Sequence, residues 1–391
     1  MPRVTGIDPG TILLVGVSTR AAAASAAAAG FPVTTIDAFA DCDVPSSVRA
    51  LSLARDFGMP FSPGAAARAA RDVECDAVAY LSSFENHPRA VSALAAGRTL
   101  WGNPPAVLRR VRDPMLVAQA LGARHIAVPG VTLSAARAEV SRGWLVKPLA
   151  SGGGHGIEPW TGGDLPRGAY LQERIDGVPG SLVFVAAGGR AVTLGVSRQL
   201  IGEDAFGLDG CRYGGNILAG AGDAQFGDDE GLVASASAIA AALAEAFDLV
   251  GVNGFDFVAR DGYPYAIEVN PRWCGSMELV ERAYGVSVFG AHASACADAT
   301  LPAFDLARAR RAARASGKAV VFAREDVTIG ETAAWLADSS VADVPHPGDR
   351  IAARRPVCTV FAEGPDGAAC HAALARRAAR IYAELAAWTS T

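Results

Sequence analysis

The chain has 391 residues, 51% of them hydrophobic, which is long and apolar enough to bury the cores of several domains. Its formal net charge of −5 is spread along the chain without a long basic stripe, which argues against nucleic acid as a partner. No apolar run approaches the roughly 20 residues that cross a bilayer, and the opening MPRVTGIDPG lacks the basic-then-apolar order of a secretory leader. We therefore expect a cytoplasmic protein with no membrane partner.

The cysteines and lysines carry different information. Seven cysteines, at positions 42, 75, 211, 274, 296, 358 and 370, are scattered without a CxxC pair, which is typical of reduced thiols rather than a disulfide framework or a zinc site. Lys147 and Lys318 are the only lysines among 35 basic residues. In a sequence that otherwise uses arginine, a lysine indicates a position where a compact ammonium is needed, so both lysines are candidates for a specific role.

The N-terminal part alternates between short apolar segments and alanine-rich segments. We expect helices at 20–29 and 87–96 and strands at 11–18, 31–36, 76–82 and 98–101. This alternation predicts a parallel sheet with helices on both faces. The first strand-to-helix turn reads GVSTRA rather than GxGxxG, so a dinucleotide site, and with it an oxidoreductase, is weakly supported.

The composition changes at Asn103, where a Pro-Pro pair and an arginine cluster indicate a domain boundary. After it we expect a helix at 114–121 and strands at 144–148, 170–175, 181–186 and 191–197. A long helix should span 229–246. The segments 251–259 and 263–269 should form a hairpin around Asp261-Gly262, a strong two-residue turn signal. The tail from Lys318 mixes short strands with a final helix at 367–388, which could form a small separate domain.

The hairpin carries the most informative polar residues. Asp256 lies on its first strand, and Glu268 and Asn270 lie two apart near the end of its second strand, so they share a face. Two carboxylates and an amide oxygen on one face suit a hard cation such as Mg²⁺, which prefers oxygen ligands. The alternative is a solvated outer face of an antiparallel sheet.

A second signal is the segment WLVKPLASGGGHG at 144–156. Lys147 near the end of an apolar strand, followed closely by consecutive glycines, offers a positive charge and a loop of exposed backbone N–H groups. That combination suits a polyphosphate, and glycine lets the backbone approach the anion closely. The alternative is an ordinary flexible surface loop. A third segment, YLQERIDG at 170–177, is a strand that breaks at Asp176-Gly177, and it is either an interlobe hinge or an edge strand with a turn.

In this order and at these separations, a lysine before a glycine-rich loop, QERIDG, an aspartate strand and AIEVNPR resemble the ATP-grasp superfamily of carboxylate–amine ligases. The resemblance covers roughly 104–300 and implies an α/β and α+β fold. Its parts would be a Rossmann-like pre-ATP-grasp domain with a parallel sheet at 1–103, a small lobe at 104–176, a large lobe with the Mg-ATP site at 177–303 and a small C-terminal α+β subdomain at 304–391. It implies ATP and Mg²⁺ (or Mn²⁺) as cofactors, small-molecule carboxylate and amine substrates, and a homodimer as an assembly to test.

The resemblance also implies a role for each matching position. Lys147 would contact the ATP phosphates beneath a closing loop made of Gly152, Gly153, Gly154, His155 and Gly156. The adenine hinge would be Gln172, Glu173, Arg174 and Ile175. The metal ligands would be Asp256, Glu268 and Asn270. The catalytic residues would be Arg272, whose planar fork suits an acyl phosphate or the γ-phosphate, and Arg198. Substrate contacts would come from Arg212, Tyr213 and Asn216.

Two departures from the family pattern bear on ATP binding. A second ATP-contacting lysine is usual at a position that matches Pro114 here, so Arg109, Arg110 or Arg112 is expected to replace it. An acidic residue that commonly contacts the ribose is replaced near Gly180. These departures keep open a nucleotide-binding protein without ligase activity. A biotin-carboxylase-like or purine-pathway carboxylating enzyme is the other alternative.

The opening VGVSTRAAAASAAAAGFPVTTIDAF and the late PHPGDRIAARRPVCTVFAEG resemble a narrower group within the superfamily. These are ligases that add glutamate in making one-carbon carrier cofactors of the methanofuran and methanopterin type, such as tyramine–glutamate ligases. A glutamate site must hold one carboxylate by arginine while presenting the other to the γ-phosphate, and Arg198, Arg212 and Arg272 are available for this. The alternative is that these arginines reflect compositional bias and solvation.

Overall fold

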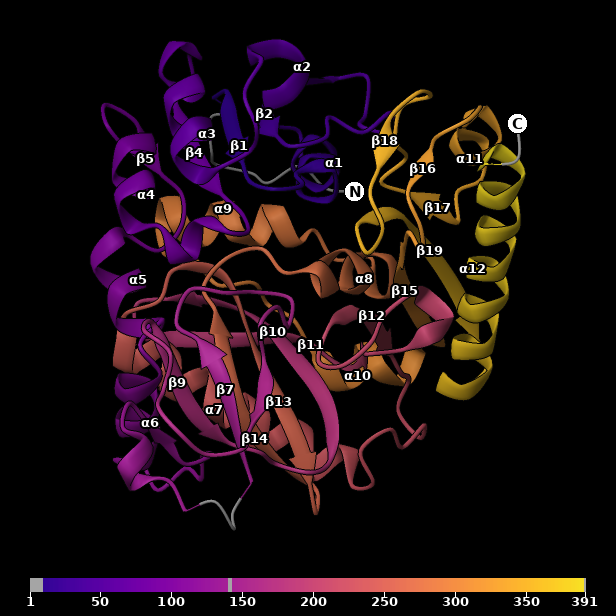
Figure 1. Cartoon of the computed structure of the whole chain (residues 1–391). Coiled ribbons are helices and arrows are strands. Elements are labelled where there is room, and N and C mark those ends of the chain that lie inside the picture. Colours follow the sequence, from indigo (N-terminus) through magenta and orange to yellow (C-terminus); the bar gives the residue numbers. More distant parts are fainter. Residues whose placement is uncertain (1–9, 140–142, 390–391) are drawn as a thin grey trace.

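The computed structural model describes residues 10–139 and 143–389 (Figure 1). The expectation about a leader rests on residues 1–9, which lie outside the described part. Within the described residues, one five-stranded parallel sheet at the N-terminus is combined with antiparallel sheets of eight, four and two strands, so the predicted fold class is confirmed. The element boundaries fall close to those expected from sequence, and the differences are concentrated in short strands and helices.

The N-terminal sheet is parallel, with the strand order β3-β2-β1-β4-β5. Its strands are β1 (Ile12–Val15), β2 (Val33–Asp37), β3 (Val48–Ser52), β4 (Ala77–Tyr80) and β5 (Thr99–Leu100). Side chains alternate along β1, so Ile12 and Leu14 face α1 (Arg20–Ala28), while Leu13 and Val15 face the opposite helices. Those helices are α3 (Pro63–Ala69), α4 (Pro88–Leu94) and α5 (Pro105–Val111). Helices thus cover both faces, as the alternating sequence predicts.

A small antiparallel sheet follows, with the order β6-β9-β7-β8. Its strands are β6 (Val131–Thr132), β7 (Trp144–Pro148), β8 (Glu158–Trp160) and β9 (Ala169–Glu173). The helix before it, α6 (Pro114–Gly122), starts where the Asp113 side chain accepts hydrogen bonds from the backbone N–H groups of Met115 and Leu116. Pro114 sits in the first helical turn, where its missing N–H costs nothing.

The large sheet has eight strands in the order β14-β13-β10-β11-β12-β15-β19-β17. They are β10 (Val178–Ala187), β11 (Arg190–Ile201), β12 (Tyr213–Leu218), β13 (Gly251–Arg260), β14 (Tyr263–Asn270), β15 (Ala315–Phe322), β17 (Val341–Ala342) and β19 (Pro356–Gly364). The C-terminal strands β15, β17 and β19 therefore continue the same sheet as the β13–β14 hairpin. A pair of short strands, β16 (Val327–Thr328) and β18 (Arg350–Ile351), completes this end.

Helices pack on both faces of the large sheet (Figure 1). One face carries α7 (Asp229–Phe247), and the other carries α8 (Gly275–Tyr284) and α9 (Val288–Asp298). The final helix α12 (Gly367–Thr389) packs along β15 and β19. The remaining helices are α2 (Leu53–Phe57), α10 (Leu306–Ala312) and α11 (Ala333–Ala337).

The helix α7 corrects one expectation about membranes. Among the described helices it alone has the length and mean hydropathy of a membrane span, although the sequence was expected to hold no such segment. In the structure it packs against β10, β11 and β14, and Leu232, Ile239, Leu243 and Phe247 are buried there. Its apolar character is therefore used in the core between helix and sheet.

A buried ionic cluster joins three distant parts of the chain. Glu278 on α8 accepts hydrogen bonds from Arg20 of α1 and from Lys318 of β15, the latter at 2.8 Å. Arg20 also contacts Asp343 at 2.8 Å and Asp43 at 3.4 Å. Burial raises the pKa of Glu278, but Lys318 and Arg20 outweigh burial and hold that pKa far below its usual range. Lys318 therefore has a structural explanation.

His292 on α9 gives the fold a testable acid sensitivity. Its Nδ1 accepts a hydrogen bond from the backbone N–H of Val252 at 3.0 Å, which requires a neutral ring nitrogen. Burial lowers the pKa of His292 from 6.5 to about 4, against a hydrogen bond with the Trp101 backbone that raises it. The unfolded chain takes up this proton near pH 6.5, so the folded state should lose about 3 kcal/mol between pH 6.5 and 4.

We expect His292→Gln to remove this share of the pH dependence of the free energy of unfolding, measured by urea denaturation from pH 4 to 7. The exposed His125 provides the control. The free energy of unfolding of His125→Gln should depend on pH in the same way as that of the wild type. A His292→Gln profile parallel to that of the wild type would contradict the prediction.

Candidate functional site

A cleft of about 540 Å³ lies between the small sheet and the large sheet. Its walls are formed by β7 and β9 on one side and by β13 and β14 on the other. Its lining includes the apolar residues Leu145, Ile157, Ile175, Val258 and Ile267. It also includes the charged residues Lys147, Asp256, Glu268 and Arg272, so the cleft can accept a ligand with both an apolar and an anionic part.

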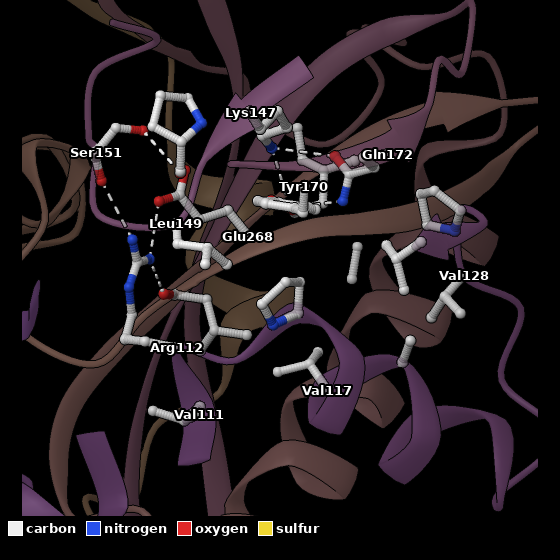
Figure 2. Close-up of a pocket in the computed structure, with 18 residues that line it drawn as sticks. Val111, Arg112, Val117, Val128, Lys147, Leu149, Ser151, Tyr170, Gln172 and Glu268 are labelled. Atoms are coloured by element: carbon white, nitrogen blue, oxygen red, sulfur yellow. Dashed lines mark hydrogen bonds and ion pairs between the residues drawn. The ribbon is translucent and has the colours of Figure 1, made fainter. Parts of the chain in front are cut away.

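Lys147 is a buried cation between the two sheets. Its ammonium donates to Gln172 Oε1 at 3.0 Å and to the carbonyl of Ile267 at 3.3 Å, as part of the contacts drawn in Figure 2. Burial lowers the pKa of Lys147, while the carboxylates of Glu268 and Asp256 oppose that shift. The sequence places lysine here near the end of an apolar strand, and the structure brings it to the predicted carboxylates.

The two predicted metal-binding carboxylates face each other across the hairpin. Asp256 and Glu268 are direct partners in the register of β13 and β14, so their side chains leave the same face of the sheet. Burial and the charge of Glu268 raise the pKa of Asp256 to about 7. Burial also raises the pKa of Glu268, but Arg112 and Lys147 outweigh it and lower that pKa. A divalent cation would favour the ionised form of both groups.

Two amide side chains hold Asp256 in place. Asn270 donates its Nδ2–H to Asp256 Oδ2 at 3.0 Å, and Gln199 donates to Asp256 Oδ1 at 2.9 Å. The Oδ1 of Asn270 accepts from Arg272 at 3.1 Å, so this predicted metal ligand is engaged within the protein. Sequence reasoning missed Gln199, although its position two residues after Ser197 on one strand would have placed both on the same face.

Metal ligation here rests on few protein groups. Within 10–139 and 143–389, no three His, Cys, Asp or Glu residues lie together as a metal site. Asp256 and Glu268 supply two carboxylates, and Asn270 could add the second lone pair of its amide oxygen, whose first accepts from Arg272. This donor set fits a hard cation that draws its other ligands from water and phosphate, as Mg²⁺ does.

The glycine-rich loop reaches across to the segment before β12. Gly153, Gly154 and Gly156 have φ of +63°, +78° and +71°, a region that favours glycine. Gly154 also approaches the carbonyl of Cys211 so closely that a Cβ would lie 1.9 Å from that oxygen. The carbonyl of Gly153 accepts from the backbone N–H of Tyr213 at 3.2 Å. Gly153 and Gly154 line the cleft, whereas Gly152, His155 and Gly156 lie outside its lining.

The segment 172–175 lines the cleft, as expected for a hinge. The Gln172 side chain binds Lys147 and the Ile267 carbonyl, and Glu173 Oε2 accepts from the backbone N–H of Gly130 at 2.9 Å. Ile175 is buried, while Arg174 forms an exposed ion pair with Asp176. The backbone of this segment is also engaged, because β9 pairs with both β6 and β7 and the N–H of Arg174 donates to the carbonyl of Gly143 at 3.0 Å. On the next strand, Gly180 packs against the ring of Phe257, where a Cβ would lie 2.4 Å from a ring carbon.

Of the three arginines considered as substitutes at the Pro114 position, Arg112 lies outside the lining of the cleft but bonds to Glu268, which lines it. It donates Nη1 to Glu268 Oε1 and to the Val269 carbonyl, both at 2.8 Å. Nη2 donates to the Ser151 carbonyl at 3.2 Å, and Figure 2 shows Arg112 between Ser151 and Glu268. Arg110 instead donates to the Ala246 carbonyl, and Arg109 lies on the surface. Arg112 thereby ties the base of the glycine loop to Glu268, one of the two predicted metal-binding carboxylates.

Arg272 lines the cleft but is already bonded to protein groups. Its Nε and Nη2 donate to Glu85 Oε1, at 3.0 and 2.7 Å, and Nη1 donates to the Trp273 carbonyl. Glu85 is buried and its Oε2 has no hydrogen-bond partner in the described residues. Sequence reasoning missed Glu85 because it comes from the N-terminal domain, 187 residues away.

The remaining predicted residues separate into two groups. Tyr213 and Asn216 line the cleft, where Asn216 donates to Ser197 Oγ at 2.9 Å. Arg198 and Arg212 do not line it. Arg198 alternates with Ser197 and Gln199, so it leaves the opposite face of β11. Arg212 lies over the ring of Phe322 and donates to the carbonyl of Arg354. Of the predicted catalytic and substrate residues, Arg272, Tyr213 and Asn216 therefore line the cleft.

Comparisons with known proteins agree with this geometry. A family model described as an ATP-grasp domain matches residues 111–276. No curated protein sequence matches the chain. The matched range 111–276 contains Lys147, the glycine loop, Asp256 and Glu268.

Three solved structures share the fold at low sequence identity. An L-amino acid ligase from Bacillus licheniformis is 16% identical with a TM-score of 0.66, and the match covers 95% of this chain and 97% of that one. An N5-carboxyaminoimidazole ribonucleotide synthetase from Thermus thermophilus is 18% identical with a TM-score of 0.65, covering 93% and 97%. A pyruvate carboxylase from Rhizobium etli is 15% identical with a TM-score of 0.71. The match covers 94% of this chain but only 37% of that longer enzyme.

Proposed function

Residues 111–276 form an ATP-grasp domain, and from this premise we propose that the protein is an ATP-dependent carboxylate–amine ligase that forms an amide through an acyl phosphate. One observation carries the proposal. A buried lysine, a glycine loop and two facing carboxylates line one cleft of about 540 Å³, which also has apolar residues in its lining. Each of these groups has a use in moving a phosphoryl group.

The chemistry of the lining suggests how ATP would lie. The adenine would pack against apolar lining residues such as Ile175 and Val258 beside the segment 172–175, and the phosphates would extend toward Lys147 and the amides of Gly153 and Gly154. Asp256 and Glu268 would hold Mg²⁺ or Mn²⁺, which supplies positive charge to the phosphates when bound. Gln199 and Arg112 would orient these carboxylates through the hydrogen bonds already present.

The proposed reaction has two steps. An oxygen of the substrate carboxylate bonds to the γ-phosphorus of ATP while the bond to ADP breaks, with Lys147 and the loop amides offsetting developing negative charge. The amine then bonds to the acyl carbon, phosphate leaves, and the amine loses a proton. Closure of the glycine loop would keep water from the acyl phosphate. The hydrogen bond from the Tyr213 N–H to the Gly153 carbonyl would hold the loop in its closed position.

For the substrate itself we propose glutamate ligation in making a one-carbon carrier cofactor. The sequence resemblance supports this choice, and Arg272 is the guanidinium in the cleft that could hold one carboxylate. Arg198 and Arg212 lie outside the cleft lining, so Arg272 would have to hold this carboxylate without them. Neutral groups such as Tyr213 and Asn216 would then meet the acceptor.

A panel of carboxylates and amines, with coupled ADP release as the readout, tests the proposed function. We expect ADP release to require one carboxylate, with glutamate plus tyramine, tyrosine or a pterin-linked amine as the leading pair. Release stimulated by bicarbonate would indicate a carboxylating enzyme, the activity class of the synthetase and carboxylase that share the fold. ATP binding without ADP release on any pair would indicate a nucleotide-binding protein that lacks ligase activity.

Arg112 should affect ATP use through its four hydrogen bonds. Arg112→Lys keeps the charge but cannot reach Asn86, Ser151 and Glu268 at once, so we expect kcat/KM for ATP to fall about tenfold or more. Arg110→Lys, two residues earlier in the chain but directed at Ala246, is the matched control and should change kcat/KM little. Equal effects of the two substitutions in steady-state assays would remove Arg112 from the site.

A further inference from the structure

A second cavity of about 750 Å³ opens on the N-terminal domain, between α3, α4 and α5. These helices follow one another along one side of the molecule in Figure 1. Small residues such as Gly64, Ala67 and Ala90 form its floor and leave it open. Its walls carry Arg68, Arg71, Arg89 and Arg109 together with His87, and we call this cavity the arginine basin.

The basin concentrates positive charge in a protein of net charge −5. No aspartate or glutamate belongs to its lining. Throughout the described ranges, none of its four arginines has an ion pair, whereas arginines such as Arg20, Arg55 and Arg310 are paired with carboxylates elsewhere in the fold. Four unneutralised guanidinium groups around one cavity raise the local concentration of anions.

The basin is linked to the ATP cleft through one side chain. Asn86, which lines the basin, donates Nδ2 to the Ser151 carbonyl at 3.2 Å and accepts at Oδ1 from Arg112 Nε at 3.1 Å. Arg112 in turn binds the metal-site carboxylate Glu268. A ligand that touches Asn86 or the adjacent His87 therefore lies next to the anchor of the glycine loop.

We propose that the arginine basin is a second ligand site, which binds a phosphate-bearing small molecule with several negative charges and is separate from the ATP cleft. Its volume falls within the roughly 300–1,000 Å³ of small-molecule sites. Guanidinium groups pair with phosphate through two parallel hydrogen bonds each. Through Asn86 its occupant adjusts the hold of Arg112 on Ser151 and Glu268, which makes the basin a place where a metabolite regulates ATP use.

Charge density favours phosphates over an acidic peptide. A polyphosphate places several charges within a few bonds, which matches cations gathered around one cavity. An extended peptide places successive side chains about 3.3–3.6 Å apart along the chain and on alternating sides, so fewer of its carboxylates face one cavity.

Calorimetric titration with inorganic tripolyphosphate tests the proposal. The basin variant is Arg68→Glu combined with Arg89→Glu, and the matched control is Arg49→Glu combined with Arg376→Glu, which makes the same charge change at exposed positions elsewhere. We expect the wild type and the control each to bind one equivalent of tripolyphosphate with similar affinity. The basin variant should bind that equivalent at least tenfold more weakly. Lys147→Met should retain that equivalent, because it alters the ATP cleft alone.

Several results would overturn the proposal. Equal weakening in the basin variant and the control would show diffuse surface attraction. Loss in Lys147→Met with full binding in the basin variant would place tripolyphosphate in the ATP cleft. Tighter binding of a glutamate-rich peptide than of tripolyphosphate, lost in the basin variant, would replace the phosphate ligand with an acidic protein segment. None of these results depends on whether the ligase activity exists.

Discussion

Lys147→Met should lower ATP turnover by at least about a hundredfold while the protein stays folded. The substitution keeps an unbranched stem between the two sheets but removes the cation that faces Glu268 and the proposed phosphate position. Removing one preorganised group that stabilises transition-state charge typically costs two to three orders of magnitude in rate. Lys147→Ala should have the same effect on turnover. ADP release under saturating ATP, with circular dichroism to verify folding, measures the change.

Arg190→Met is a suitable control, since it removes one exposed cation at the β10–β11 turn. Its turnover should match that of the wild type. Near-normal turnover in Lys147→Met would remove this lysine from the phosphate site, and the glycine loop beside it would then be a structural loop. Loss of folding in Lys147→Met but not in Lys147→Ala would attribute the effect to packing.

Glu278→Gln should reduce the free energy of unfolding by about 3–5 kcal/mol, the range found when one partner of a buried ion pair is removed. Glu278 is buried and receives hydrogen bonds from Arg20 and Lys318, so its neutralisation leaves two buried cations with fewer partners. Because Arg20 and Lys318 hold its pKa well below the usual value, the stabilisation is present at neutral pH. It is lost as the pH falls below the ordinary pKa near 4.5 toward the folded value.

Glu245→Gln on α7 makes the same change at an exposed ion pair with Arg124 and should cost less than about 1 kcal/mol. Urea denaturation of both variants at pH 7 and at pH 4 gives the comparison. The difference in the free energy of unfolding between Glu278→Gln and the wild type should be smaller at pH 4 than at pH 7. A loss at pH 7 no larger than that of Glu245→Gln would mean that the cluster does not hold the three parts of the chain together.

Much of the secondary structure was predictable because local patterns carry it. The strand β7 and the hairpin β13–β14 fall within one residue of the expected ranges, since an apolar run and an Asp-Gly turn define them. The helices α1, α6 and α7 were predicted equally closely from alanine-rich or apolar periodicity. The strands β3 and β12 were missed, because VRALS and YGGNIL are short and lack a strong alternation.

Residues of the site were predictable where they sit on one strand or one loop. Lys147, Asp256 and Glu268 meet as expected, because strand periodicity and hairpin register are local properties. Arg198 was expected in the site because of its charge. Side chains alternate along a strand, however, so Arg198 leaves the face of β11 opposite to that of Ser197 and Gln199. Glu85 and Asn86 come from a separate domain and bond to Arg272 and Arg112, and such contacts have no local signal. The domain boundaries, a homodimer and a cytoplasmic location stay predictions.

Hydroxylamine trapping tests the acyl phosphate at the centre of the proposed function most directly. Whichever carboxylate stimulates ADP release is incubated with ATP, Mg²⁺ and hydroxylamine in the absence of the natural amine, and the product is detected by mass spectrometry. We predict a hydroxamate that requires ATP and the carboxylate and that disappears with Lys147→Met. No hydroxamate from any carboxylate that stimulates ADP release, or ADP release that depends on bicarbonate instead, would contradict the account.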